Sequence, residues 1–98
     1  MQPVSYKRAY AIGNAIGINW SVVPLRWWTH GLNVELELGR HWARVSPAAN
    51  VTNDDLLATA GIALAHLIEF PDYYQRLAVM ERQADAYWSE RHKPAVLR

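Results

Sequence analysis

The chain has 98 residues, with five tryptophans, five tyrosines and no cysteine. This length suits one domain with a single core, and the lack of cysteine excludes disulfide bonds, thiolate metal sites and a cysteine nucleophile. Ten basic and nine acidic residues give a formal net charge of +1, which is not typical of a protein that neutralises many phosphates. We therefore expect one domain over residues 1–98, with a mobile basic tail at 91–98 and no nucleic-acid partner.

No apolar stretch approaches the roughly 20 residues of a membrane span, and the best candidate, 56–68, contains His66. The start of the chain lacks the apolar run of a secretory signal, because Asn14 and two glycines interrupt it. We therefore expect a cytoplasmic protein that does not use a membrane.

A first helix is predicted from Ser5, which is a good N-cap, to about Ile16. Gly17 follows directly and is expected to end it. Gly13 lies inside this helix, where glycine costs about 1 kcal/mol relative to alanine. Its presence therefore indicates the close approach of a neighbouring helix.

A second helix is predicted to begin near Pro24, a residue that suits a first helical turn, and to stop at Gly39. Its apolar stripe consists of Leu25, Trp28, Leu32 and Leu36. The segment 32–38, with the sequence LNVELEL, also alternates apolar and polar residues, which is the period of a strand. An α+β fold with a short strand at 32–38 is therefore the alternative to an all-α fold.

Residues 40–51 are expected to form a connecting loop, in which Trp42 and Val45 pack back against the body of the protein. Thr52 is then a predicted N-cap, whose hydroxyl accepts from the backbone N–H of Asp55. The third helix is predicted over about 53–69. Its broad apolar face consists of Leu56, Leu57, Ala60, Ala63, Leu64 and Leu67.

Pro71 separates the third helix from a fourth one, which is predicted to reach about Glu90. One side of the fourth helix carries Tyr73, Leu77, Met80, Ala84, Tyr87 and Trp88. We expect an all-α fold, a small four-helix bundle. Its interior would be made mainly by the third and fourth helices, which meet at the Phe70–Pro71 corner.

Four segments together are similar to an uncharacterised family of short bacterial and phage proteins: GINW at 17–20, GLNVELELG at 31–39, NVTNDD at 50–55 and IALAHLIEFPDYY at 62–74. The match covers most of residues 5–85. It implies a phage or prophage origin, and thus a place in the host cytoplasm or in a virion, rather than a known activity. The family pattern VELEHG has Leu38 at its histidine position here, so a role of that histidine does not carry over.

A divalent metal site is one chemical hypothesis. His66 and Glu69 are three residues apart and therefore share one helical face, which is a spacing at which a histidine and a carboxylate can bind one ion. Glu37 on the second helix would be a third ligand. In the simpler interpretation, His66 caps its helix or hydrogen-bonds a neighbour. Glu69 and Asp72 then satisfy the N-terminus of the fourth helix.

Aromatic residues suggest an interaction surface as the other hypothesis. Of the adjacent Trp27 and Trp28, one is expected to face inward and to leave the other near the surface, beside Arg26. Tryptophan and arginine dominate protein-binding hot spots. Tyr73 and Tyr74 could add to such a surface, although paired tyrosines in a small protein more often fill the core.

No nucleophile elbow, phosphate-binding loop or dinucleotide-binding motif occurs in the sequence. We therefore predict a non-catalytic phage or prophage accessory protein without a cofactor, which binds another protein, with self-association as one form of that binding. The alternative is a small metal-binding domain in which Glu37, His66 and Glu69 hold a divalent ion, with hydrolysis as one use of it.

Overall fold

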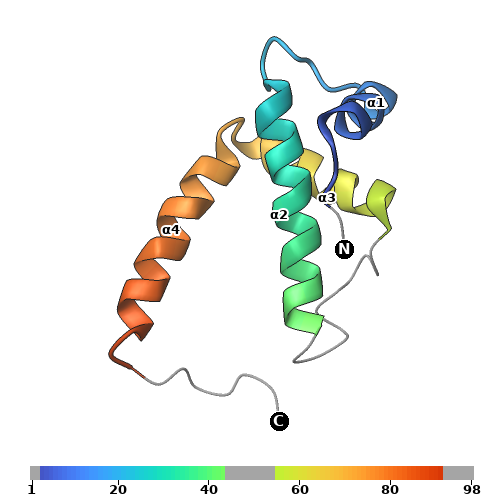
Figure 1. Ribbon diagram of the computed structural model, residues 1–98. Coiled ribbons are helices and arrows are strands. Elements are labelled where there is room, and N and C mark those ends of the chain that lie inside the picture. Colours follow the sequence, from blue (N-terminus) through green and yellow to red (C-terminus); the bar gives the residue numbers. More distant parts are fainter. Residues whose placement is uncertain (1–2, 44–54, 92–98) are drawn as a thin grey trace.

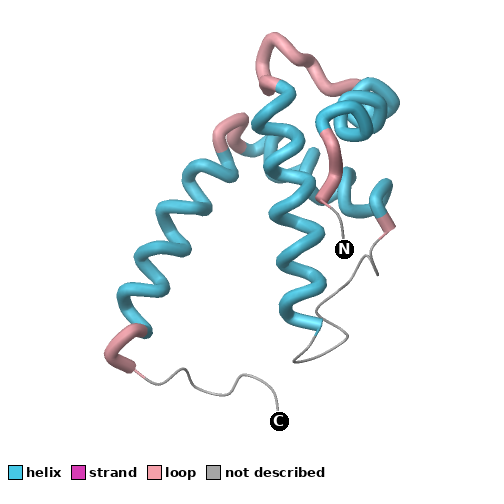
Figure 2. The backbone as a smooth tube through the Cα atoms, viewed as in Figure 1, coloured by secondary structure: helices cyan, strands magenta, loops and turns pink. Residues whose placement is uncertain are grey.

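The structure, a computed structural model, describes residues 3–43 and 55–91, without the side chains of residues 38–43. It contains the helices α1 (Tyr6–Ile16), α2 (Leu25–Ala43), α3 (Leu56–Glu69) and α4 (Tyr73–Trp88) (Figure 1, Figure 2). No strand occurs among the described residues, which confirms the all-α class. The alternative of a strand at 32–38 is wrong, because this segment lies inside α2.

Local signals at both ends of α1 act as predicted. The Ser5 hydroxyl accepts from the backbone N–H of Arg8 at 3.2 Å. Gly17 ends the helix with a φ of 87°, a left-handed conformation that glycine adopts without strain. A side chain at Gly13 would collide with the Trp20 ring and would lie 3.0 Å from the indole nitrogen of Trp28. The predicted close approach at Gly13 is therefore confirmed, and two indole rings make it.

The second helix is longer than predicted. It begins directly after Pro24, whose carbonyl accepts from the backbone N–H of Trp28 at 3.1 Å, and it continues to Ala43. The predicted stop at Gly39 is wrong, because one glycine costs only about 1 kcal/mol in a long helix that is hydrogen-bonded on both sides of it. Residues 40–43 of the expected loop thus belong to α2. Val45 and the side chain of Trp42 lie outside the described residues.

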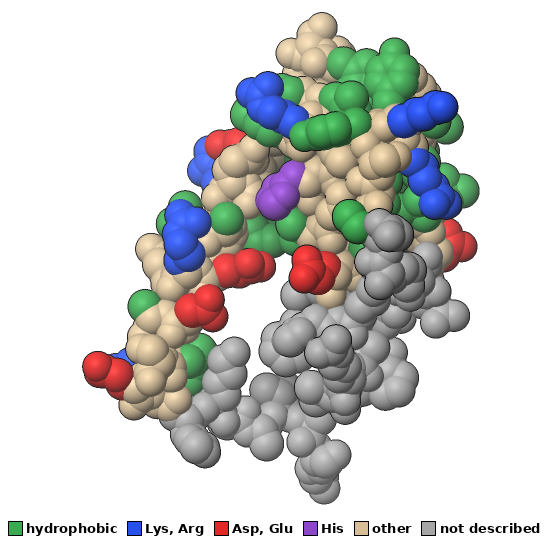
Figure 3. All heavy atoms as spheres, viewed as in Figure 1, with side chains coloured by type: hydrophobic (Ala, Val, Ile, Leu, Met, Phe, Trp, Pro, Cys, Tyr) green, Lys and Arg blue, Asp and Glu red, His purple; other side chains and the backbone are tan. Residues whose placement is uncertain are grey.

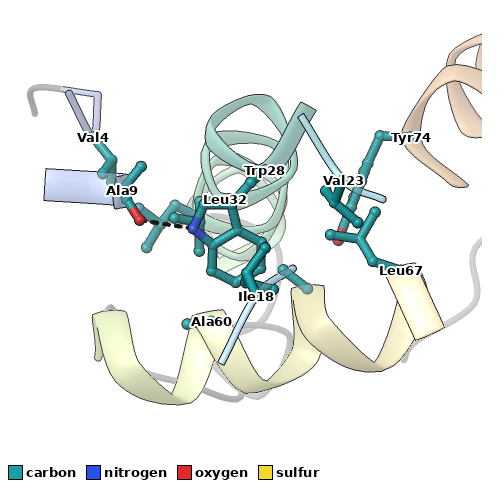
Figure 4. Packing of buried hydrophobic residues seen from close by; sticks show 11 residues of the cluster. Val4, Ala9, Ile18, Val23, Trp28, Leu32, Ala60, Leu67 and Tyr74 are labelled. Atoms are coloured by element: carbon teal, nitrogen blue, oxygen red, sulfur yellow. Dashed lines mark hydrogen bonds between the residues drawn. The ribbon is translucent and has the colours of Figure 1, made fainter. Parts of the chain in front are cut away.

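The core is built around α2, which lies between α1 and α4 in Figure 1. Trp28 and Leu32 are fully buried, and they pack with Ala9 of α1 and with Ala60 and Ala63 of α3 (Figure 4). The indole N–H of Trp28 donates to the Ala9 carbonyl at 2.8 Å. Burying a side chain such as Leu32 contributes about 2 kcal/mol, and the alanines allow the helices to approach closely.

Asp55 is the N-cap of α3, and its side chain accepts from the backbone N–H of Ala58 at 3.0 Å. The helix therefore starts at Leu56, three residues after the predicted start. The predicted cap, Thr52, lies outside the described residues. The end at Glu69 is as predicted, but Leu57 of the expected apolar face is 64% exposed.

The last helix, α4, diverges from α2 as it leaves the Phe70–Pro71 corner (Figure 1). Tyr74, in its first turn, is its one buried residue. Farther along α4, Met80 is 58% and Tyr87 52% exposed. The expected interior between the third and fourth helices is therefore wrong, because the large side chains of α2 occupy the centre and α4 is attached only near its start.

No helix in the described part of the chain is both long enough and apolar enough to span a membrane. Of the basic tail expected at 91–98, only Arg91 lies within the described residues.

Candidate functional site

Three polar side chains from three helices meet where α2, α3 and α4 join. One carboxylate oxygen of Glu35 accepts a hydrogen bond from the Tyr74 hydroxyl at 2.8 Å, and the same oxygen lies 2.8 Å from Nδ1 of His66. The Tyr74 hydroxyl and His66 Nδ1 are 3.3 Å apart. We call these three residues the junction cluster. It is the polar contact that joins α4 to both other helices.

A glycine on α2 makes room for the junction cluster. A side chain at Gly31 would lie 2.5 Å from the nearest atom of the Tyr74 ring. The ring therefore packs directly against the α2 backbone. Glu35 follows Gly31 by four residues and so lies on the same face of α2, within reach of the Tyr74 hydroxyl.

Burial and neighbouring charge keep Tyr74 and the adjacent Tyr73 neutral. Burial is the main cause that raises the pKa of Tyr74, and its hydrogen bond to the Glu35 carboxylate raises it further. Burial also raises the pKa of Tyr73, followed by the charges of Glu35, Glu69 and Glu81. Tyr74 is therefore a permanent hydrogen-bond donor to Glu35 at physiological pH.

His66 is held on two sides. Its ring stacks on the Tyr73 ring, with the centroids 4.2 Å apart and an angle of 8° between the planes, and Glu35 accepts from Nδ1. In the neutral imidazole, Nδ1 then carries the proton and the lone pair lies on Nε2, which has no hydrogen-bond partner among the described residues. The side chain is 31% exposed. A carboxylate-oriented imidazole of this kind can accept a proton or ligate a metal ion through Nε2.

The structure pairs His66 with Glu35 and not with Glu37, the residue singled out as a metal ligand. Two residues apart on a helix means nearly opposite faces, and Glu37 is exposed, as is Glu69. Among the side chains that the structure describes, no group of three His, Cys, Asp or Glu residues could hold a metal ion. The predicted set of Glu37, His66 and Glu69 is therefore not assembled here, and His66 bonds a neighbour as in the simpler interpretation.

Glu35 was not among the predicted site residues, because helical spacing alone does not specify which of the two opposite faces of α2 meets α3. A usable signal was present: Gly31 and Glu35 share one helical face.

Asp72 differs from its expected role at the start of α4. Its carboxylate accepts from Arg76 at 2.8 Å and makes no capping bond to the backbone, and this hydrogen bond lowers its pKa.

Five residues were predicted for protein binding. Tyr73 is half-buried in its stack with His66, and the other four are divided between core and surface. Trp28 and Tyr74, at 0% and 2% exposure, belong to the core and cannot contact a partner. Trp27, on α2, is half-buried and contacts Gln75 of α4. In the amide orientation that satisfies both groups, its indole N–H donates to the Gln75 side-chain oxygen at 3.0 Å. Arg26 is exposed, with its guanidinium 5.9 Å from the centre of the Trp27 ring.

An exposed apolar surface lies instead on α4. We call it the α4 stripe, and it consists of Leu77, Met80, Ala84 and Tyr87. Leu77 is half-buried at the end near the body, whereas the rest of the stripe is exposed. The Arg91 guanidinium lies 4.2 Å from the centre of the Tyr87 ring. Figure 3 shows a hollow between α4 and the body, with acidic side chains at its rim.

A shallow apolar groove of about 220 Å³ lies on another part of the surface, between the α1–α2 connection and the second half of α3. Ile18, Val22, Leu64 and Ile68 are among the residues that line it. Ile68 is 75% and Val22 53% exposed. The groove is therefore open and lacks the convergent polar groups that orient a small ligand.

These features define a small all-α protein in which a three-helix core carries a fourth, diverging helix through a glutamate–histidine–tyrosine junction. The chain belongs to the family described as "Protein of unknown function (DUF5661)", which matches residues 9–83. This confirms the resemblance to an uncharacterised family, and the matched region contains the whole junction cluster. No curated protein and no solved structure matches the chain.

Proposed function

We propose that this protein is a non-catalytic accessory protein that binds another protein through the α4 stripe. The observation behind the proposal is the exposure of large apolar side chains on a helix that leaves the body of the protein: 58% for Met80 and 52% for Tyr87. Contiguous exposed apolar surface is typical of protein interaction sites.

The low stability expected for the far half of α4 on its own supports the same proposal. Isolated helices shorter than about 12–15 residues are only marginally stable in water. Beyond Ala78, every residue of α4 except the half-buried Trp88 is exposed, so packing contributes little to the far half of this helix. A partner on the α4 stripe would supply the missing packing.

We also propose the phage or prophage origin that the resemblance implies, with action in the host cytoplasm or in a virion. The absence of nucleophile and phosphate-binding motifs from the sequence supports a binding role over catalysis.

Site-directed photocrosslinking in cells that express the protein tests this function. A photoreactive phenylalanine analogue at Met80 or Tyr87 is expected to give protein adducts, and the same analogue at Tyr6 is not. Tyr6 is a matched control because it is 59% exposed but lies on α1. Equal adducts from Tyr6 and Met80, or none from Met80 and Tyr87, would contradict the proposal.

A metal-binding role is the second candidate, and one observation favours it: Glu35 orients His66 so that Nε2 is available, as is common for metal-bound histidines. Elemental analysis of the purified protein tests it. Stoichiometric zinc or another divalent metal that is lost in His66→Ala would support this role. Protein that stays free of metal after dialysis against zinc would contradict it.

A further inference from the structure

The four residues of the α4 stripe follow the heptad pattern of a coiled coil, in which one helix face packs against the same face of a second helix. Leu77 and Ala84 occupy position a of a heptad, and Met80 and Tyr87 occupy position d, so the spacing alternates between three and four residues. We infer that the α4 stripe binds the α4 stripe of a second copy of this chain, with the two helices parallel. This inference rests on the proposed function, because it names the partner of the same surface.

Exposure along α4 limits the contact to this stretch. Tyr74 is buried against the chain's own body and is not available to a partner. The stretch from Leu77 to Tyr87 spans three turns, and its large exposed side chains are Met80 and Tyr87, with Val79 on a different face. Ala84 adds little bulk at position a, so two backbones can approach closely there.

The charges beside the stripe decide its orientation. Arg76 is at position g and Glu81 at position e. In a parallel pair, position g of one helix faces position e of the next heptad of the other. Arg76 of each copy then faces Glu81 of the other copy. An antiparallel pair centred on the same stripe would instead place Glu81 opposite Glu81, which is repulsive.

Arg76 can make this contact without losing its present one. Its Nε donates to the Asp72 carboxylate at 2.8 Å, and its guanidinium lies 4.3 Å from the centre of the Phe70 ring. The two terminal nitrogens of the guanidinium are not used in the bond to Asp72. The existing contacts therefore hold Arg76 near the start of α4 and leave donors for a second carboxylate.

Sedimentation of the purified full chain over a wide concentration range tests the inference. We expect a reversible dimer, and Met80→Glu should weaken it at least tenfold. A tenfold rise in the dissociation constant corresponds to ~1.4 kcal/mol of lost association free energy. Val79→Glu is the matched control, because Val79 is 46% exposed on the same helix but lies outside the stripe. The inference fails if the chain is monomeric at every concentration, or if both variants have the same effect.

Charge reversal tests the pairing of Arg76 with Glu81. Arg76→Glu and Glu81→Arg each convert two attractive contacts into two repulsive ones, which is expected to weaken the dimer about tenfold. Mixing the two variants restores opposite charges at both contacts, so the mixture should dimerise like the original chain. A mixture as weak as the separate variants would contradict the pairing.

A single introduced cysteine tests the orientation, since the chain has no other cysteine. Two copies of Ala84→Cys face each other in the parallel pair and should form a disulfide-linked dimer under mild oxidation. Gln83→Cys is the control, because residues 83 would face each other in the antiparallel pair. Preferential crosslinking of Gln83→Cys would overturn the parallel orientation.

The outcomes separate this inference from the proposed function. If the purified chain is monomeric but position 80 still crosslinks to a different protein in cells, self-association is wrong and the α4 stripe remains an interaction surface. If position 80 gives no adduct and the chain is monomeric, both are wrong.

Discussion

At residue 31 of α2, the missing side chain allows the Tyr74 ring to lie against the backbone of that helix. Glycine inside a helix costs about 1 kcal/mol relative to alanine, and contact with the buried Tyr74 ring offsets this cost. The same packing brings the Tyr74 hydroxyl to Glu35, which also binds His66. A single small residue therefore positions the polar group that joins three helices.

Gly31→Ala is expected to destabilise the protein by about 1–3 kcal/mol, because the added methyl group overlaps the Tyr74 ring and outweighs the gain in helix propensity. Gly61→Ala is the matched control. Gly61 also lies inside a helix, but a side chain there meets nothing within 4 Å, so this change should stabilise by about 0.5–1 kcal/mol. Urea denaturation followed by circular dichroism measures both, and two changes of the same sign would contradict this account of Gly31.

Tyr74→Phe is expected to lower the free energy of unfolding by about 1–2 kcal/mol, because it removes a donor to the partly buried Glu35 carboxylate. Tyr73→Phe should change it by less than about 0.5 kcal/mol, since the Tyr73 hydroxyl makes no hydrogen bond to the described residues. The comparison uses chemical denaturation at neutral pH. Equal losses in the two variants would show that the hydroxyl of Tyr74 is not the important group.

From the raised pKa of Tyr74 we also predict how the free energy of unfolding changes with pH in the alkaline range. Because the folded pKa of Tyr74 is raised above the ordinary 10.0, the unfolded chain loses this proton first as the pH rises. The stabilisation is fully present below pH 10 and decreases above it. Denaturation at a series of pH values should therefore show a decrease above pH 10 that is smaller in Tyr74→Phe than in the original chain, and parallel curves would rule out this linkage.

At the scale of the helices, capping residues and breakers set most ends. Ser5 and Gly17 bound α1, and the Phe70–Pro71 corner separates α3 from α4. At the start of α3, residue type alone allows more than one N-cap. Thr52 and Asp55 are both good N-caps by residue type, and in the structure the side chain of Asp55 makes the capping bond.

Asp55→Ala should therefore destabilise the protein by about 1 kcal/mol, the usual effect of losing an N-cap. The loss would appear in thermal unfolding as a lower midpoint, together with earlier hydrogen exchange of the first turn of α3. Ser5→Ala, which removes the corresponding cap of α1, gives a reference value measured in the same protein. If Asp55→Ala has no effect, the helix begins at an earlier residue.

At the scale of the whole molecule, the described residues form a three-helix core and a fourth helix attached to it. The buried apolar side chains come from α1, α2, α3 and the segments beside them, and α4 adds only Tyr74 to them. Contacts of α4 therefore concentrate at its start, where Trp27, Glu35 and His66 meet its first turns. The far half of α4 depends on its own backbone hydrogen bonds or on a partner.

This arrangement predicts uneven local stability. In dilute protein, backbone amides between Val79 and Trp88 should exchange with deuterium through local opening, whereas those between Trp28 and Leu36 should exchange only on global unfolding. Mass spectrometry of peptides from the two segments measures the difference. At concentrations where the chain dimerises, the far half of α4 should become protected. Equal protection of both segments in dilute protein would show that α4 belongs to the cooperative core.

The number, order and most boundaries of the helices were predictable from the sequence alone, because caps, prolines and apolar spacing act through neighbours along the chain. The α-helical period, read from Leu25 onward, also favoured the helical reading of 32–38. The family resemblance likewise followed from the sequence, since it rests on contiguous segments such as 62–74.

Only the tertiary structure decided which side chains meet. Glu35 rather than Glu37 faces His66, and Trp28 rather than Trp27 fills the core, because the angles at which α3 and α4 cross α2 select one face of that helix. The apolar side of α4 looked like a core face by spacing, yet it is exposed beyond the first turns. Spacing along a helix specifies which residues share a face, whereas the packing of the other helices determines whether that face is covered.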